Sequence, residues 1–214
     1  MLNVNELPVV PELHWIPREN SQFNVRCLDV RSFTTNMIST TADQKLSQKF
    51  IELRKSNGEH VRNEMPDQAV HIDCQLIYPH QGQTRDGALY MSREMEDKWD
   101  VFLFDGSLFF SRSWSGVLVY KAAVTFSQTQ AVISSIEAIR QTTGLGLWVA
   151  ICSVDYLVKS HLYRREAPHT LPPNIPEDEM GIAAFSFQEY GRWASYATYE
   201  DTTRINLDKC PRRG

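Results

Sequence analysis

Histidine side chains are the first candidates for chemistry, because an unperturbed imidazole titrates near pH 6.5 and can act as an acid or a base. His161 and His169 lie in the second half of the chain, and Asp155 precedes His161 by six residues. On one helix that separation is about 600° of rotation, so the carboxylate and the imidazole would lie on different faces. Asp155 is spaced instead to pair with Lys159 at i+4.

The familiar catalytic and cofactor motifs are missing from the sequence. It contains no phosphate-binding loop, no His-Glu-x-x-His zinc helix and no Gly-x-Ser-x-Gly nucleophile turn. His71 and Cys74 would point to opposite faces of one strand, so they do not suggest a metal site with His80. The sequence therefore predicts neither a metal nor a cofactor. A catalytic nucleophile would have to come from elsewhere, for example from Ser113 or Cys74.

The most distinctive short segment is Arg112-Ser113-Trp114-Ser115-Gly116. A guanidinium beside an indole can form a stacking or anion-binding surface, because arginine pairs with carboxylate or phosphate through two donors. Tyr120 follows, and Trp, Tyr and Arg are the residue types that anchor protein interfaces. The structural alternative is a hairpin capped by Trp114, with Arg112 bound to loop carbonyls. The binding interpretation assigns Arg112, Trp114 and Tyr120 to one face.

This part of the chain resembles a group of uncharacterised bacterial proteins. The resemblance covers roughly residues 90–175 and implies a bacterial origin, but it implies no activity because none is known for the group. It rests on these short motifs: Asp97-Lys98-Trp99-Asp100, Asp105-Gly106, Arg112-Ser113-Trp114-Ser115-Gly116, Val154-Asp155-Tyr156-Leu157, Ser160-His161-Leu162, Ala167-Pro168-His169 and Leu171-Pro172.

The composition excludes several classes of protein. The 214 residues carry 22 Lys and Arg against 26 Asp and Glu, a net charge of −4. A dense basic face is not expected, so nucleic acid is not a predicted partner. The start of the chain has no secretory pattern, and the longest apolar stretch is too short to span a membrane. Four widely spaced cysteines predict free thiols in a reducing compartment, and hence a cytoplasmic protein.

A three-stranded antiparallel meander over about 99–126 is the clearest predicted structure. Asp105-Gly106 between two β-rich runs is typical of a type I′ turn, and Trp114-Ser115-Gly116 indicates a second turn. These turns predict strands over 99–104, 107–113 and 117–126.

The other predicted elements follow from apolar periodicity and end signals. They are strands over 23–33, 69–78 and 192–199, a helix over 42–56 with Thr41 and Gln44 as a capping box, a helix from Ser127 to Gly144, a buried helix over 147–163 (with a strand as the alternative), a proline-rich connector without regular structure around 168–176, and a helix from Pro176 to Gly191.

Strands that cluster in hairpins predict an α+β fold, an antiparallel sheet built around the meander with helices mainly on one face. We expect an extended lead-in over residues 1–20, one domain over 21–205 and a polar tail over 206–214. The favoured function is a non-catalytic binding or regulatory module that presents the hairpin face to a protein or a small anionic ligand. The alternative is a small hydrolase or transferase with His161 or His169 as acid or base, assisted by Asp155 or Asp100.

Overall fold

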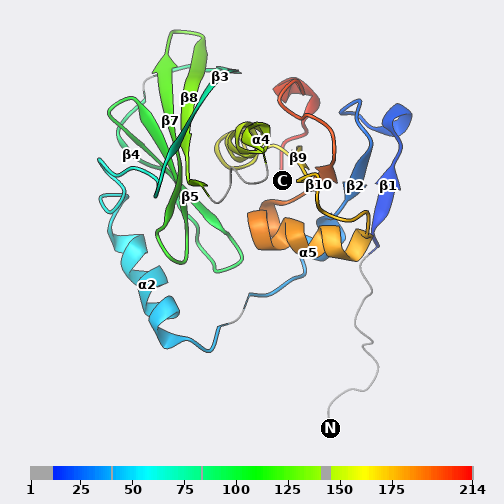
Figure 1. The fold of residues 1–214 in the computed structure, drawn as a ribbon, viewed down its shortest axis with the longest axis horizontal. Helices are drawn as coiled ribbons and strands as arrows, with labels where there is room; N and C mark the ends of the chain where they lie inside the picture. Colours follow the sequence, from blue (N-terminus) through cyan, green and yellow to red (C-terminus); the bar gives the residue numbers. More distant parts are fainter. Residues whose placement is uncertain (1–11, 40, 83, 141–145, 214) are drawn as a thin grey trace.

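The computed structural model describes residues 12–39, 41–82, 84–140 and 146–213 (Figure 1). These residues form two sheets with a helix between them. The larger sheet is antiparallel, with strand order β3-β8-β7-β6-β5-β4, and the smaller is mixed, with order β1-β2-β10-β9. The predicted α+β class with an antiparallel sheet is therefore confirmed. None of the helices within the described ranges has the length and apolar character needed to cross a membrane.

The predicted meander forms the centre of the larger sheet. Asp105 and Gly106 have φ angles of 49° and 73°, the positive values that a type I′ turn requires. The turn sets the register, so that Trp99 pairs with Arg112. The strands of this sheet are β3 (Val70–Pro79), β4 (Gly87–Tyr90), β5 (Trp99–Phe104), β6 (Ser107–Arg112), β7 (Leu118–Phe126) and β8 (Gln130–Ala138).

The helix predicted from Ser127 was wrong, because this segment is strand β8. The Ser127 N–H donates to the carbonyl of Gln130 over 2.8 Å, and the Gln130 N–H donates to Ser127 Oγ over 3.0 Å. These bonds close the β7–β8 hairpin instead of capping a helix. A register shift lies between Ile133 and Ser135, so one extra residue interrupts the strand alternation and imitates helical spacing. The predicted end at Gly144 lies outside the described residues.

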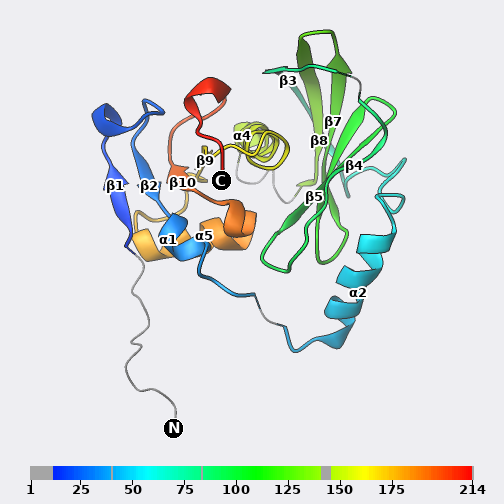
Figure 2. The same ribbon diagram turned by 180° about the vertical axis from the view of Figure 1, so that it is seen from behind.

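The apolar helix predicted over 147–163 is confirmed as the centre of the molecule. It consists of α4 (Leu147–Leu157) followed by a π-helical turn, η2 (Val158–Leu162). Figures 1 and 2 show this helix between the two sheets. Leu147 and Trp148 in its first turn are exposed, but from Val149 onward its apolar residues are buried almost all the way round, and Ala150, Val154 and Leu157 are completely inaccessible to solvent.

The smaller sheet contains two strands that differ from the predictions. Pro168–Thr170 forms β9, although the proline-rich connector was expected to lack regular structure. Proline is tolerated here because it is the first residue of the strand. Residues 1–20 were expected to form an extended lead-in, but His14–Ile16 forms β1 on the edge of this sheet. The sheet consists of β1 (His14–Ile16), β2 (Cys27–Asp29), β9 (Pro168–Thr170) and β10 (Tyr196–Thr198).

The helix predicted from Pro176 to Gly191 is confirmed as α5 (Glu179–Tyr190). It lies beside the smaller sheet and reaches toward the larger one (Figure 1). Helix α2 (Gln44–Lys55) is also confirmed, but Asp43 caps it rather than Thr41, since Asp43 Oδ1 accepts the Lys45 N–H over 2.9 Å. The remaining helical turns are α1 (Arg31–Thr34), η1 (Arg18–Asn20), η3 (Gly191–Trp193) and η4 (Leu207–Lys209).

The N-terminal cap of α5 is Asp178, and its contribution to stability can be tested by substitution. Asp178 Oδ2 accepts the Gly181 N–H over 2.7 Å, which satisfies a donor that would otherwise have no partner in the first turn. We expect Asp178→Ala to lower the free energy of unfolding by about 1 kcal/mol in urea titrations. Asp178→Asn keeps an acceptor oxygen and should retain most of the stability. Equal stability of the two variants would contradict this assignment.

Candidate functional site

The two histidines proposed for acid–base chemistry are sealed inside the protein. His161 is 2% exposed and His169 is fully buried. Burial lowers the pKa of His161 to about 3 and that of His169 to about 4, because the charged imidazolium cannot be hydrated there. Each ring is hydrogen-bonded to a serine, Ser160 in the first case and Ser186 in the second. Both histidines are therefore neutral and screened from solvent at physiological pH.

Asp155 forms the ion pair with Lys159 that its i+4 spacing predicts. Lys159 Nζ lies 2.6 Å from Asp155 Oδ2, and the Tyr78 hydroxyl donates to Asp155 Oδ1 over 2.8 Å. Lys159 also donates to the carbonyl of Thr202. Burial raises the pKa of the Asp155 carboxyl to about 6, and the lysine opposes this rise. This cluster joins α4 to β3 and to the C-terminal segment, so its contacts are structural.

The other residues considered for chemistry are also engaged in structural contacts. Asp100 is buried in an ion pair with Arg54, and it accepts the Ser92 N–H over 2.8 Å. His71 lies on the surface, hydrogen-bonded to Glu137. No group of three or more His, Cys, Asp or Glu side chains within the described ranges is arranged to hold a metal ion. The four cysteines are free thiols.

Tyr120 does not belong to an exposed hairpin face. Its side chain is only 2% exposed and its ring stacks on Trp99, with 5.8 Å between the ring centroids. The alternation of β7 turns Tyr120 toward the main core, together with Ala122 and Val124. The predicted binding set of three residues is therefore reduced to Arg112 and Trp114, both of which are half-buried.

Arg112 links the hairpin to the end of α5. Its Nη2 lies 2.6 Å from Glu189 Oε2, and its Nη1 donates to the Glu189 carbonyl over 2.8 Å. The guanidinium also lies 4.2 Å above the ring of Trp99. The structural alternative, an arginine bound to a carbonyl, thus describes Arg112 correctly, although the carbonyl belongs to a helix. Trp114 Nε1 donates to the Met95 carbonyl over 2.7 Å, so this ring is also fixed in place.

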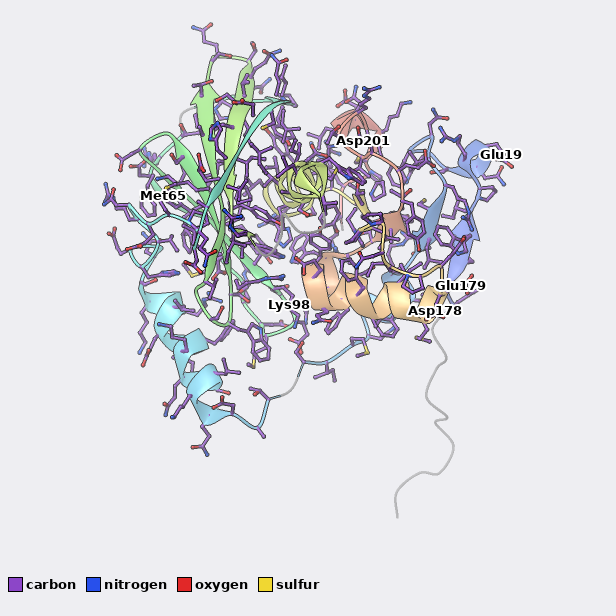
Figure 3. All side chains as sticks on the ribbon, viewed as in Figure 1. Glu19, Met65, Lys98, Asp178, Glu179 and Asp201 are labelled. Atoms are coloured by element: carbon purple, nitrogen blue, oxygen red, sulfur yellow. The ribbon has the colours of Figure 1, made fainter. Side chains whose placement is uncertain are left out.

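A groove of about 320 Å³, which we call the hairpin groove, lies between the hairpin and α5. Figure 3 shows Lys98 at this junction of the larger sheet with α5. The residues that line the groove come from three parts of the chain: the residue before β5, the end of β6 with the turn after it, and the last turns of α5. Its lining residues are Lys98, Arg112, Trp114, Phe187 and Gln188.

Lys98 is the charged residue of this groove that the sequence interpretation did not include, and Phe187 and Gln188 were not included either. Its ammonium lies 5.0 Å from the ring centroid of Trp114 and 4.8 Å from that of Phe187. It donates to Ser39 Oγ over 2.6 Å and to the Met95 carbonyl over 3.1 Å. Burial lowers its pKa, and the neighbouring positive charge of Arg112 contributes to the same effect, whereas the carboxylates of Glu96 and Asp97 act in the opposite direction from a greater distance.

The charge of Lys98 has no directly paired counter-ion. Within the part of the chain that the structure describes, no carboxylate lies within 4.0 Å of its ammonium, whereas Arg112 has Glu189. The predicted hairpin register could have identified Lys98. A turn at Asp105-Gly106 places Trp99 opposite Arg112, so Lys98, the residue before Trp99, lies at the same end of the sheet. The groove thus combines a half-buried, unpaired positive charge with two aromatic surfaces.

Comparison with known proteins gives no relative to which this groove can be matched. The chain matches no family model, no curated protein and no solved structure. The resemblance to an uncharacterised bacterial group therefore stays a prediction.

Proposed function

We propose that the protein is a non-catalytic binding module whose hairpin groove takes an acidic peptide segment of a partner protein. The observation that carries this proposal is the ammonium of Lys98, which lies near the rings of both Trp114 and Phe187 and, among the described residues, has no carboxylate within 4.0 Å. A partly desolvated cation gains more from an added anion than an exposed one, because water screens the attraction less.

The walls of the groove favour a peptide over a simple inorganic anion. Trp114 and Phe187 supply flat apolar surfaces beside the charge, so a ligand gains from pairing an acidic group with an adjacent apolar side chain. Aromatic rings in a partly desolvated pocket are typical anchors of protein interfaces. Arg112 is held by Glu189, so its role in this proposal is to fix the groove wall and to add positive potential.

Enzymatic alternatives receive less support from the geometry. A hydrolase or transferase that used His161 or His169 would need one of these rings to reach a substrate, and both are buried in the core. This burial favours the binding function over the catalytic one. Bacterial origin and a cytoplasmic location stay predictions from the sequence.

The proposal can be tested with a short synthetic peptide, acetyl-Gly-Glu-Leu-Glu-Gly-amide, and its counterpart with glutamine in place of glutamate. By isothermal titration calorimetry at low salt, we expect the acidic peptide to bind at least tenfold more tightly, which is about 1.4 kcal/mol. Lys98→Met keeps the length of the side chain but removes its charge, so it should abolish this preference. Added salt should weaken binding of the acidic peptide.

A matched control is available on the same sheet. Lys121 lies over the ring of Phe109 at 5.2 Å but is outside the groove, so Lys121→Met should leave peptide binding unchanged. Trp114→Ala should keep the circular dichroism spectrum of the folded protein and lose the peptide. Equal affinity for both peptides, or equal losses in Lys98→Met and Lys121→Met, would overturn the proposal. An unfolded Trp114→Ala protein would show that this ring is structural.

A further inference from the structure

A second pocket, which we call the apolar pocket, lies between the larger sheet and the π-helical turn η2. Its volume is about 350 Å³, within the range of small-molecule sites. It is separate from the hairpin groove, since none of the described residues lines both. The sheet residues at its floor, Leu108, Val124 and Ile133, are at most 5% exposed. Its rim includes the exposed side chains of Gln81 and Leu89.

The pocket arises because one helix cannot cover six strands. Strands spaced about 4.8 Å apart make this sheet more than 20 Å wide, whereas a helix with its side chains is about 10 Å across. Beyond α4, the chain forms the π turn, and Val158 and Leu162 from this turn line one wall. π-helical turns are uncommon and occur frequently at functional sites.

The wall formed by Tyr163 is fixed in position. Its hydroxyl donates to the Pro79 carbonyl over 2.6 Å, and its ring stacks on that of Tyr78, with 5.8 Å between the centroids. The Tyr78 hydroxyl in turn donates to Asp155 of the buried ion-pair cluster. The two stacked rings are therefore held before any ligand arrives, which reduces the ordering cost of binding.

The chemistry of the lining selects the ligand. Among the described residues that line the pocket there is no Asp, Glu, Lys or Arg, so a charged ligand would lose its hydration without gaining an ionic partner. The floor is aliphatic, and the wall includes the aromatic rings of Tyr78, Phe126 and Tyr163. Polar groups are found toward the rim, where His80 and Gln81 lie. The volume is that of about a dozen liquid waters, which suits a molecule of about a dozen non-hydrogen atoms.

We propose that the apolar pocket binds a small neutral aromatic molecule, with its ring against the floor and one hydroxyl group at the rim. This site would give the protein a small-molecule ligand in addition to its peptide groove. The proposal does not depend on the hairpin groove, and a failure of either one leaves the other standing.

The test uses 2-naphthol as a neutral probe and 2-naphthoate as its charged counterpart, with the full chain at neutral pH. We expect naphthol to bind with a micromolar dissociation constant and to shift the NMR signals of Tyr78 and Tyr163, while naphthoate binds at least tenfold more weakly. Ala131→Phe places a ring in the pocket and should reduce naphthol affinity at least tenfold. Val132→Phe is its control, because Val132 is next in β8 and does not line the pocket.

A second variant keeps the test decisive if Ala131→Phe does not fold. Leu89 is 41% exposed at the rim, so Leu89→Trp should fold and should narrow the entrance, with a similar loss of naphthol affinity. Equal binding of naphthol and naphthoate would overturn the proposal, as would unchanged affinity in a folded variant of the pocket. A dimer that Leu89→Trp dissociates would also overturn it, because a second copy of the chain would then occupy the pocket.

Discussion

Lys159→Met is expected to lower the free energy of unfolding by about 3–5 kcal/mol, the largest effect that we predict for a single substitution outside the apolar core. The methionine has a similar length, so packing is nearly preserved and the loss reports mainly on charge, with a smaller part from the lost hydrogen bond to the Thr202 carbonyl. Without the ammonium, the Asp155 carboxylate is left in the core with only the Tyr78 hydroxyl as its partner. Asp155 must then either stay charged without compensation or take up a proton, and both cost free energy at pH 7.

The double variant Asp155→Asn/Lys159→Met isolates this cause. It removes both charges together, so no uncompensated ion remains, and it should recover much of the stability that the single variant loses. The measurement is urea unfolding at pH 7 for the wild type and the two variants. The deficit of Lys159→Met should shrink at lower pH, because protonation of Asp155 removes the unpaired charge. A double variant as unstable as the single one would contradict this account.

The elements predicted correctly are those whose signals are local. Asp105-Gly106 specified a tight turn, and the turn then fixed the meander and its register. The buried helix α4 follows from an apolar stretch that needs no partner to be identified. The pair of Asp155 with Lys159 follows from helical spacing alone.

The failures come from contacts between distant segments. Strand β8 contains a bulge after Ile133, and its break in alternation resembles a helical stripe unless the neighbouring strand is known. Strand β9 pairs in parallel with β10, and no local pattern announces this pairing across α5. Tyr120 was placed on the exposed face because the sequence does not say which face of the meander α4 covers.

The candidate site follows the same division. Arg112 and Trp114 were singled out because they share one short turn with unusual chemistry. Phe187 comes from α5, and only the folded structure brings it to Lys98. The same contact with α5 explains why Arg112 is held by Glu189 instead of being free for a ligand. A functional assignment from the hairpin alone therefore selected Arg112, whose charge is already paired with Glu189, and did not include Lys98.

The protein should lose stability as the pH falls from about 6.5 to 4.5, because its two buried histidines cannot accept protons while folded. His161 and His169 have folded pKa values of about 3 and about 4, below the unfolded value of about 6.5. Below pH 6.5 the unfolded chain binds protons that the folded chain refuses, and each histidine removes up to about 1.4 kcal/mol per pH unit. Above pH 6.5 this contribution to the slope vanishes.

Asp155 opposes this loss but does not cancel it. Its folded pKa of about 6 exceeds the unfolded value of about 3.9, so the folded state gains a proton first and is stabilised as the pH falls through 6. Counting these three groups, two histidines against one carboxyl leave the unfolded state about one proton ahead, which corresponds to a loss of about 1.4 kcal/mol per pH unit and of about 3 kcal/mol over this interval. His60, whose pKa burial also lowers, adds to this loss, and Asp100, whose pKa burial raises, opposes it. Urea unfolding at several pH values measures this slope. His161→Gln, which cannot be protonated, should reduce the loss by about 1.4 kcal/mol per pH unit, whereas a variant of the exposed His71 should leave it nearly unchanged. A His161→Gln protein with the full wild-type slope would show that other groups cause the acid sensitivity.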